Sequence, residues 1–171
     1  RVVDHETVGV VTMPVMNQVL EFLEFVERQP RQSVRQLMNK VLLKSRLMTG
    51  AEAGTIFIVR NKGAQRWLKP ISLQNDAVRI GSNDFIVPIT TKSIAGFVAS
   101  SGEIVRIHDV YNIPSGKPYS FNPDNELANY HTMSVLCFPL KNYQDQVIGV
   151  VQLINRRVPG DDKPARFTDQ Q

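Results

Sequence analysis

Cysteine is nearly missing from this chain of 171 residues, in which Cys137 is the only one. A single thiol cannot form an internal disulfide, and it excludes zinc sites built on paired cysteines. The simplest expectation is therefore a reducing, cytoplasmic setting. No apolar run approaches the roughly 18 residues of a membrane-spanning helix. No secretory signal pattern follows Arg1 either, and we expect the chain to be a fragment of a longer protein.

The chain also has no basic run interleaved with aromatic residues. Its 20 Lys and Arg exceed its 16 Asp and Glu by a net charge of +4, but the two signs are mixed along the sequence. Nucleic-acid-binding modules concentrate such residues in recognisable patterns, so we expect a solvated, mixed-charge surface and no nucleic-acid partner. The composition that remains, 42% hydrophobic and 21% charged, is typical of one globular domain.

Two helices are predicted in the first fifty residues. The apolar stripe of residues 14–29 is wider than one helical face, so this helix must cover a second surface, either its own sheet or the same helix of another subunit. Pro30 ends it, and residues 31–49 form a second helix that Gly50 closes. The first stripe comprises Met16, Leu20, Phe22, Leu23, Phe25 and Val26, and the second comprises Val34, Leu37, Met38, Val41, Leu42 and Met48.

Most of the remaining apolar segments alternate as β-strands. Residues 133–140 and 147–154 are apolar on both alternating faces, which is typical of strands covered on both sides. In the extended run 85–89, Pro88 favours an edge position because proline cannot donate to a neighbouring strand. The other predicted strands are residues 54–60 and 66–73, which flank a hairpin turn at 61–63, and residues 103–109.

Short helices and loops fall between these strands. Residues 93–100 form a helix that Gly102 ends, residues 112–123 form a loop, and residues 125–130 form a helical turn. One face of the sheet is therefore predicted to carry a roof of short elements, a construction that leaves a cavity. The predicted pocket lies between the sheet and the roof segments 93–100 and 121–132.

Four segments, in their order and spacing, resemble a GAF domain of the cyclic-nucleotide phosphodiesterase and cyclase type. The resemblance covers roughly residues 33–171, and "QND" at 74–76 with "YSFNPDNE" at 119–126 is similar to the bacterial signalling-protein variety. The four segments are "GTIFIV" at 54–59, "SIAGFVASSGEIVRIHDVYN" at 93–112, "YHTMSVLCFPLKN" at 130–142 and "VIGVVQLINR" at 147–156.

The resemblance implies an α+β, GAF-like (profilin-like) fold. Its six-stranded antiparallel sheet carries dimerisation helices on one face and a capped ligand pocket on the other. We accordingly divide the chain into an N-terminal extension and dimerisation helix, residues 1–30, and a single GAF domain, residues 31–171. The spacing of Thr168 and Gln171 matches a capping box, so a truncated C-terminal helix is expected to begin there. The resemblance therefore leads us to expect a homodimer that forms through the N- and C-terminal helices.

The resemblance also names candidate ligand contacts. In ligand-binding relatives a cyclic nucleotide is held by the start of a helix, by a loop aromatic and by polar residues before the next strand. A helix N-terminus offers N–H groups to phosphate, an aromatic ring stacks on a base, and Asn or Thr reads its edge. Carried over to this sequence, these positions are Ile94, Ala95, Phe121, Asn125 and Thr132.

The chain departs from cyclic-nucleotide-binding relatives in two places. Ala128-Asn129 stands where they often have Thr-Gly, which removes a hydroxyl, and Arg156 with Gln171 replaces a Lys–Asp ion pair. Two functions therefore remain open. One is a regulatory sensor module of a multidomain signalling protein, which binds a small molecule such as a cyclic nucleotide and controls an attached output domain. The alternative is a ligand-free dimerisation and signal-transmission module.

Catalysis has little support in the sequence. His108 beside Asp109 has no nucleophile near it, and His108 and His131 lack further ligands at metal spacing. Cys137 lacks the second cysteine that GAF-fold methionine sulfoxide reductases use, and we expect it to be buried with a raised pKa. The prediction is a non-catalytic domain without metal or an assured cofactor, with a nucleotide phosphodiesterase or cyclase as the candidate output domain of the full-length protein.

Overall fold

The computed structural model describes Glu21, Glu24, residues 33–81 and residues 84–169. Of the predicted helix 14–29, only Glu21 and Glu24 are described, and both are helical. The rest of that helix lies outside the described residues, as does Gln171 of the predicted capping box. The residues from Val34 onward form a compact unit of their own, which the following paragraphs describe.

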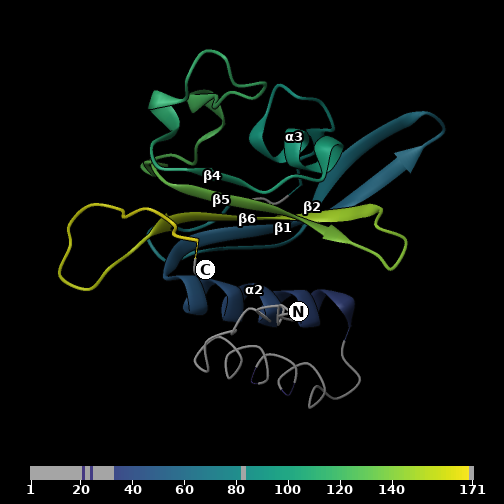
Figure 1. The fold of residues 1–171 in the computed structure, drawn as a ribbon. Coiled ribbons are helices and arrows are strands. Elements are labelled where there is room, and N and C mark those ends of the chain that lie inside the picture. The colour runs from purple at the N-terminus through teal and green to yellow at the C-terminus, as the bar shows by residue number, and fades with distance from the viewer. Residues whose placement is uncertain (1–20, 22–23, 25–32, 82–83, 170–171) are drawn as a thin grey trace, which may run out of the picture. The chain divides into compact units, whose positions relative to one another are not determined.

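The centre of this unit is one six-stranded antiparallel sheet in the order β3-β2-β1-β6-β5-β4 (Figure 1). The prediction of such a sheet is confirmed, and Pro88 lies in an edge strand as expected. The strands are β1 (Ala51–Lys62), β2 (Gln65–Asn75), β3 (Val87–Pro88), β4 (Val105–Ile107), β5 (Val135–Lys141) and β6 (Val147–Arg156).

Helices cover both faces of the sheet, which confirms the α+β, GAF-like class. Helix α2 (Val34–Thr49) lies against one face, and α3 (Ile94–Ser101) lies against the other (Figure 1). The 3-10 helices η1 (Val110–Asn112) and η2 (Pro123–Asn125) join α3 on its face. No helix in the described part of the chain combines the length and apolarity needed to cross a bilayer.

The prediction of a helical turn at residues 125–130 is wrong. The 3-10 helix η2 ends at Asn125, and the chain then turns through Asn129, whose φ is +62°. A right-handed helix cannot include that conformation, although Asn adopts it more readily than most residues do.

The predicted face of α2 is only partly correct. Leu42 is fully buried and Met38 packs near it, but Val34 is 66% exposed because it lies in the first turn. Arg46, one turn after Leu42, is buried instead. Its guanidinium donates to the carbonyls of Ala51 and Glu52 and to Gln74 Oε1, and it pairs with Asp76, so each nitrogen of the buried charge has an acceptor.

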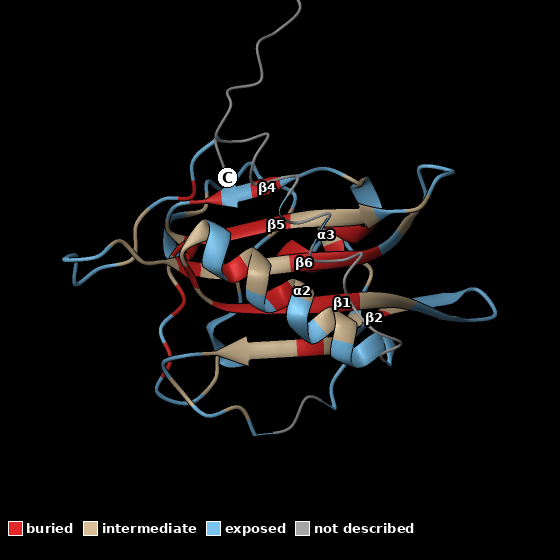
Figure 2. Ribbon diagram, turned by 90° about the horizontal axis from the view of Figure 1, so that it is seen from below, coloured by how far each residue is buried: buried red, intermediate tan, exposed pale blue. Residues whose placement is uncertain are grey.

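Two apolar cores lie on the two faces of the sheet, as the two-sided strands predicted. Val135 and Cys137 of β5 face the α3 side, while Leu136 faces the α2 side together with Phe138. Figure 2 views the unit from the α2 side and shows buried positions along the central strands. The α3-side core holds Phe57, Leu68, Ile94, Ala95, Val98, Ala99, Val105, Ile107, Val110, Val135, Cys137 and Val150, and the α2-side core holds Leu42, Ala51, Ile56, Leu136, Val151, Leu153 and Phe167.

Candidate functional site

The roof, which comprises α3 and residues 108–134, carries the residues predicted to hold a ligand. Helix α3 is capped at its N-terminus by Ser93, whose hydroxyl accepts from the Gly96 N–H at 3.1 Å, and at its C-terminus by Gly102, whose φ is +71°. Gly96 lies so close to the preceding chain that a β-carbon there would be 2.7 Å from the Pro88 carbonyl oxygen. The first turn of α3 is therefore held directly on the backbone that follows β3.

Ile94 and Ala95 open this turn, but their side chains belong to the core. They are 6% and 5% exposed and pack with Val98 against the sheet. What these two positions can offer to a ligand is their backbone N–H groups, because the first N–H groups of a helix have no partner inside it.

Phe121 and Thr132 belong to a group of residues that we call the roof cluster: Tyr111, Phe121, Glu126, His131 and Thr132, the last through its backbone N–H. The Tyr111 ring stacks on His131, with centroids 4.9 Å apart and planes at 10°, and meets Phe121 edge to face at 5.4 Å. The Tyr111 hydroxyl donates to Glu126 Oε2 at 2.9 Å, and Glu126 Oε1 accepts from the Thr132 N–H at 2.6 Å. Tyr111 and His131 are exposed, while Phe121 is half-buried.

Electrostatics favour one protonation pattern beside the cluster. The Asn112 side chain and the Tyr111 N–H both donate to the Asp109 carboxylate, and they lower the pKa of Asp109. Desolvation, followed by the contact with Glu126, raises the pKa of Tyr111. Tyr111 therefore keeps its proton and donates to Glu126.

Asn125 is not part of this arrangement. It lies exposed at the end of η2, where its N–H donates to the Asn122 carbonyl at 3.1 Å. Within the described part of the chain, no hydrogen bond ties its side chain to the roof cluster. Of the five predicted contacts, the structure groups Phe121 with Thr132 and places Phe121 against the core that contains Ile94 and Ala95.

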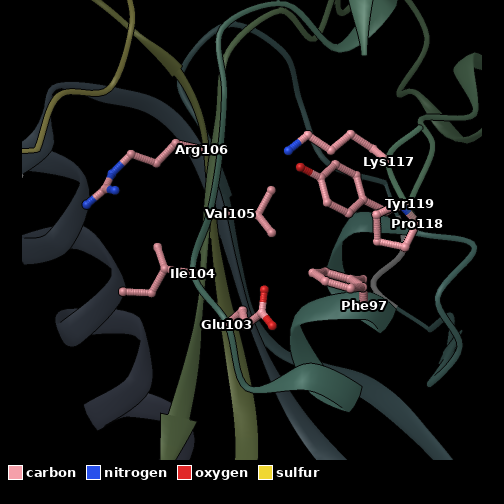
Figure 3. Close-up of a pocket in the computed structure, with 8 residues that line it drawn as sticks. All are labelled: Phe97, Glu103, Ile104, Val105, Arg106, Lys117, Pro118 and Tyr119. Carbon is pink, nitrogen blue, oxygen red and sulfur yellow. The ribbon is translucent and has the colours of Figure 1, made fainter. Parts of the chain in front are cut away.

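A hollow of about 480 Å³ lies beside α3 and the edge strand β4 (Figure 3). Phe97 and Tyr119 face each other there with centroids 5.1 Å apart, and burial raises the pKa of Tyr119. Phe97 belongs to the predicted roof segment 93–100, but no residue of the segment 121–132 lines the hollow. Its lining residues are Phe97, Glu103, Ile104, Val105, Arg106, Lys117, Pro118 and Tyr119.

Asn155 organises the chain around Thr132, a role that sequence reasoning missed. It is 1% exposed with a φ of +55°, at the end of β6. Its Oδ1 accepts from the N–H groups of Met133 at 2.8 Å and Ser134 at 3.3 Å, and its Nδ2 donates to the His131 carbonyl at 2.8 Å and the Tyr130 hydroxyl at 3.1 Å. One amide side chain thus fixes the segment that carries His131 and Thr132.

The neighbours of Asn155 extend this network. Burial, reinforced by Glu52, raises the pKa of Tyr130. Glu52 also accepts from Arg157 Nε at 2.8 Å. The sequence analysis placed Arg156 and Gln171 where relatives have a Lys–Asp ion pair. In the structure, the Arg156 side chain donates to the Arg166 carbonyl at 3.1 Å. The network therefore connects the roof to the chain that leaves the sheet after β6.

The remaining reactive groups have structural positions. Cys137 is fully buried, and burial raises the pKa of its thiol as predicted, so the thiol stays neutral. Among the residues that the structure describes, no three His, Cys, Asp or Glu side chains are grouped so as to hold a metal ion. His131 instead stacks on Tyr111.

Comparison with known proteins agrees with this architecture. The family model of the GAF domain matches residues 33–171. The cGMP-specific 3',5'-cyclic phosphodiesterase of Drosophila melanogaster is 29% identical over 129 residues, which cover 70% of this chain and 11% of that protein. The chain thus spans about a tenth of the length of such curated relatives.

Solved structures show the same fold at low identity. The GAF domain from a phosphoenolpyruvate-protein phosphotransferase of Coxiella burnetii superposes with a TM-score of 0.68 at 13% identity, covering 92% of this chain and 83% of that one. The corresponding Acinetobacter domain gives a TM-score of 0.66 at 11% identity over the same shares. With its sheet, its roof and the match over residues 33–171, the chain belongs to the GAF domain family, whose members are regulatory sensor modules of signalling proteins.

Proposed function

We propose that this GAF domain senses a small molecule at the roof cluster and controls an attached output domain. The observation that carries the proposal is the exposed Tyr111–His131 stack beside half-buried Phe121, held by a carboxylate that also binds the Thr132 N–H. Aromatic faces with a few fixed polar groups are typical of small-molecule sites. The N–H groups at Ile94 and Ala95, with Asn125, complete the proposed set.

A cyclic nucleotide is the candidate ligand. Aromatic rings suit its base, and the first turn of α3 suits its phosphate. The similar proteins include cGMP-specific phosphodiesterases, which supports the class of ligand and a phosphodiesterase or cyclase as the output domain. Ala128 lacks the threonine hydroxyl that cyclic-nucleotide-binding relatives often have at this position, so several nucleotides should be tested. We further propose a cytoplasmic location, since the described cysteine is a free thiol.

Phe121→Ala and Thr132→Ala are expected to weaken nucleotide binding at least about fivefold. The measurement is a thermal-shift screen with cGMP, cAMP and cyclic dinucleotides, followed by calorimetry. A nucleotide at a hundred times its Kd stabilises the domain by about 2.7 kcal/mol. Tyr143→Ala is the control, because Tyr143 is 95% exposed at a hairpin tip and should leave affinity unchanged. Equal affinity in all three variants would remove the roof cluster from the site.

The alternative is dimerisation and signal transmission without a ligand, and one observation favours a dimer in either case. Leu43 and Leu47 of α2 lie one turn apart and are 46% and 71% exposed, so the outer face of the C-terminal half of this helix carries two apolar side chains. We propose a homodimer through the N- and C-terminal helices, with residues 1–30 as the dimerisation extension of the domain 31–171. A two-fold axis would bury such faces against each other.

Phe22→Glu is expected to convert this dimer to a monomer, since Phe22 belongs to the surplus apolar stripe of residues 14–29. Light scattering across protein concentrations measures the mass directly. Tyr143→Glu introduces the same charge at an exposed position and should remain dimeric. A monomeric parent at high concentration would contradict the dimer. No thermal shift with any nucleotide, in a protein that is dimeric, would favour the ligand-free alternative.

A further inference from the structure

The sheet has two edge strands, and β4 is the better suited of the two to accept a further strand. At the other edge, β3 consists of Val87 and Pro88 alone, and proline has no N–H to donate. Residues 103–107, which comprise β4 and the two residues before it, contain no proline. Every second residue of such an edge directs its N–H and C=O groups away from the sheet.

The outer backbone groups of β4 have no backbone partner in the described part of the chain. On its inner side, β4 pairs with Val135–Cys137 of β5. Within residues 33–81 and 84–169, no further strand or loop forms a backbone hydrogen bond with β4. An edge of this kind is a template for another chain, because its donors and acceptors match those of an extended backbone.

The hollow of about 480 Å³ lies along this edge and is lined from both faces of β4 (Figure 3). Val105 faces the α3-side core, whereas Ile104 and Arg106 project to the opposite face, as alternation requires. A small-molecule pocket encloses most of its ligand, but here Glu103, Ile104 and Lys117 are exposed. An added strand fits such a lining better, because its own side chains project to both faces in turn.

The α3 side of the hollow carries two charges of opposite sign and two aromatic rings. Figure 3 shows Glu103 beside the start of β4 and Lys117 toward its end. Neither side chain makes an ion pair or hydrogen bond with any residue that the structure describes. Phe97 and Tyr119 are half-buried and lie against each other, with centroids 5.1 Å apart. The two charges differ at the two ends of the edge, so they distinguish the two directions of a bound segment.

We propose that β4 binds an extended segment of a partner protein, which joins the sheet as an antiparallel strand. The sheet is already antiparallel, and this pairing is slightly more stable per residue than the parallel one. On the α3 side, the segment presents in chain order an acidic residue toward Lys117, an aromatic residue beside Phe97 and Tyr119, and a basic residue opposite Glu103. The site shares no residue with the roof cluster, and the inference does not depend on ligand binding there.

A second copy of this chain matches the edge less well than such a segment. Opposing residues of an antiparallel pair share a face, and a two-fold axis would pair β4 with itself. Pairing centred on Arg106 would set two arginines opposite each other, which is destabilising. Pairing centred on Val105 would set Glu103 opposite the apolar Ile107. In neither register does a basic residue of the second strand lie opposite Glu103.

The test measures binding of a fluorescein-labelled heptapeptide to the whole chain by anisotropy. The peptide alternates threonine with glutamate, phenylalanine and lysine in that order, because threonine favours extended structure. A second peptide has the glutamate and lysine exchanged and is therefore identical in composition. The first peptide is expected to bind at least about fivefold more tightly. The double variant Glu103→Lys/Lys117→Glu should reverse this preference.

Single variants locate the charge contact. Lys117→Glu is expected to weaken binding of the first peptide about fivefold. Lys163→Glu, at an exposed position in the loop after β6, makes the same charge change and should lower affinity less than about twofold. The melting temperature of each variant confirms folding.

Backbone pairing is tested separately by N-methylation of the peptide. An added strand directs alternate N–H groups toward β4 and the others toward solvent. Methylation of one alternate set should therefore abolish binding, whereas methylation of the other set should change affinity less than about threefold. Chemical-shift mapping should perturb the amides of residues 103–107 and leave that of Val87, at the other edge, unchanged.

The inference is overturned if the two peptides bind equally, if the double variant keeps the original preference, or if both methylated sets bind like the parent peptide. Absence of binding at about 1 mM peptide would overturn it as well. A second copy would be the occupant if the amides of residues 103–107 are protected from hydrogen exchange in the free protein and lose this protection on dilution. That result would also overturn the inference.

Discussion

Replacing Asn155 with alanine is expected to lower the free energy of unfolding by about 4 kcal/mol. The side chain is 1% exposed and bonds to the N–H groups of Met133 and Ser134 and to the His131 carbonyl. Without it these buried groups lose their partners, and each unsatisfied group costs about 1–3 kcal/mol. Alanine also adopts the φ of +55° at a cost that asparagine largely avoids.

Urea unfolding measures this loss, and Asn142→Ala supplies a matched control. Asn142 Oδ1 also accepts from two N–H groups, those of Gln144 and Gln146, each at 3.0 Å, but it lies at an exposed hairpin turn. Water replaces its hydrogen bonds, so a loss of only about 1 kcal/mol is expected there. Equal losses in the two variants would show that Asn155 does not organise the roof.

Gly96→Ala is expected to destabilise the protein by about 3 kcal/mol and to loosen α3. The added methyl group would overlap backbone oxygens of Pro88 and Thr90, which cannot move as a side chain can. Either the turn after β3 or the first turn of α3 must shift, and the Ser93 cap would be strained with it. Because Ile94 and Ala95 begin this helix, nucleotide affinity should fall together with stability.

Hydrogen exchange of the α3 amides, measured beside urea unfolding, localises the effect. Gly116→Ala is the control, because a β-carbon at Gly116 meets no atom within 4 Å and its φ is not in the left-handed region. It should stay within about 0.5 kcal/mol of the parent. Unchanged exchange in α3 of Gly96→Ala would contradict the close seating of this helix on the β3 connection.

Strand positions were predictable because alternation is a local property. Val135 and Cys137 face one core and Leu136 the other, as a period of two requires. The same reasoning failed at Val34, since helical spacing identifies a face but not how far the sheet extends beneath it. The burial of Arg46 was unpredictable for a related reason: its partner Gln74 is 28 residues away.

The candidate site was likewise predictable only in part. Phe121 and Thr132 were named from the resemblance, but the residues that join them, Tyr111 and Glu126, were not. They come from a 3-10 helix and a loop, which have no apolar periodicity to reveal which side chains meet.

By itself the sequence determined the six-stranded sheet, its two covered faces, the α3 roof helix and membership of the GAF family, because periodicity, caps and motif spacing are written along the chain. Only the tertiary structure decided which buried polar side chains are satisfied, as it did for Asn155 and Arg46. Such contacts join segments far apart in sequence, and their energy depends on burial and distance, which exist only once the chain has folded.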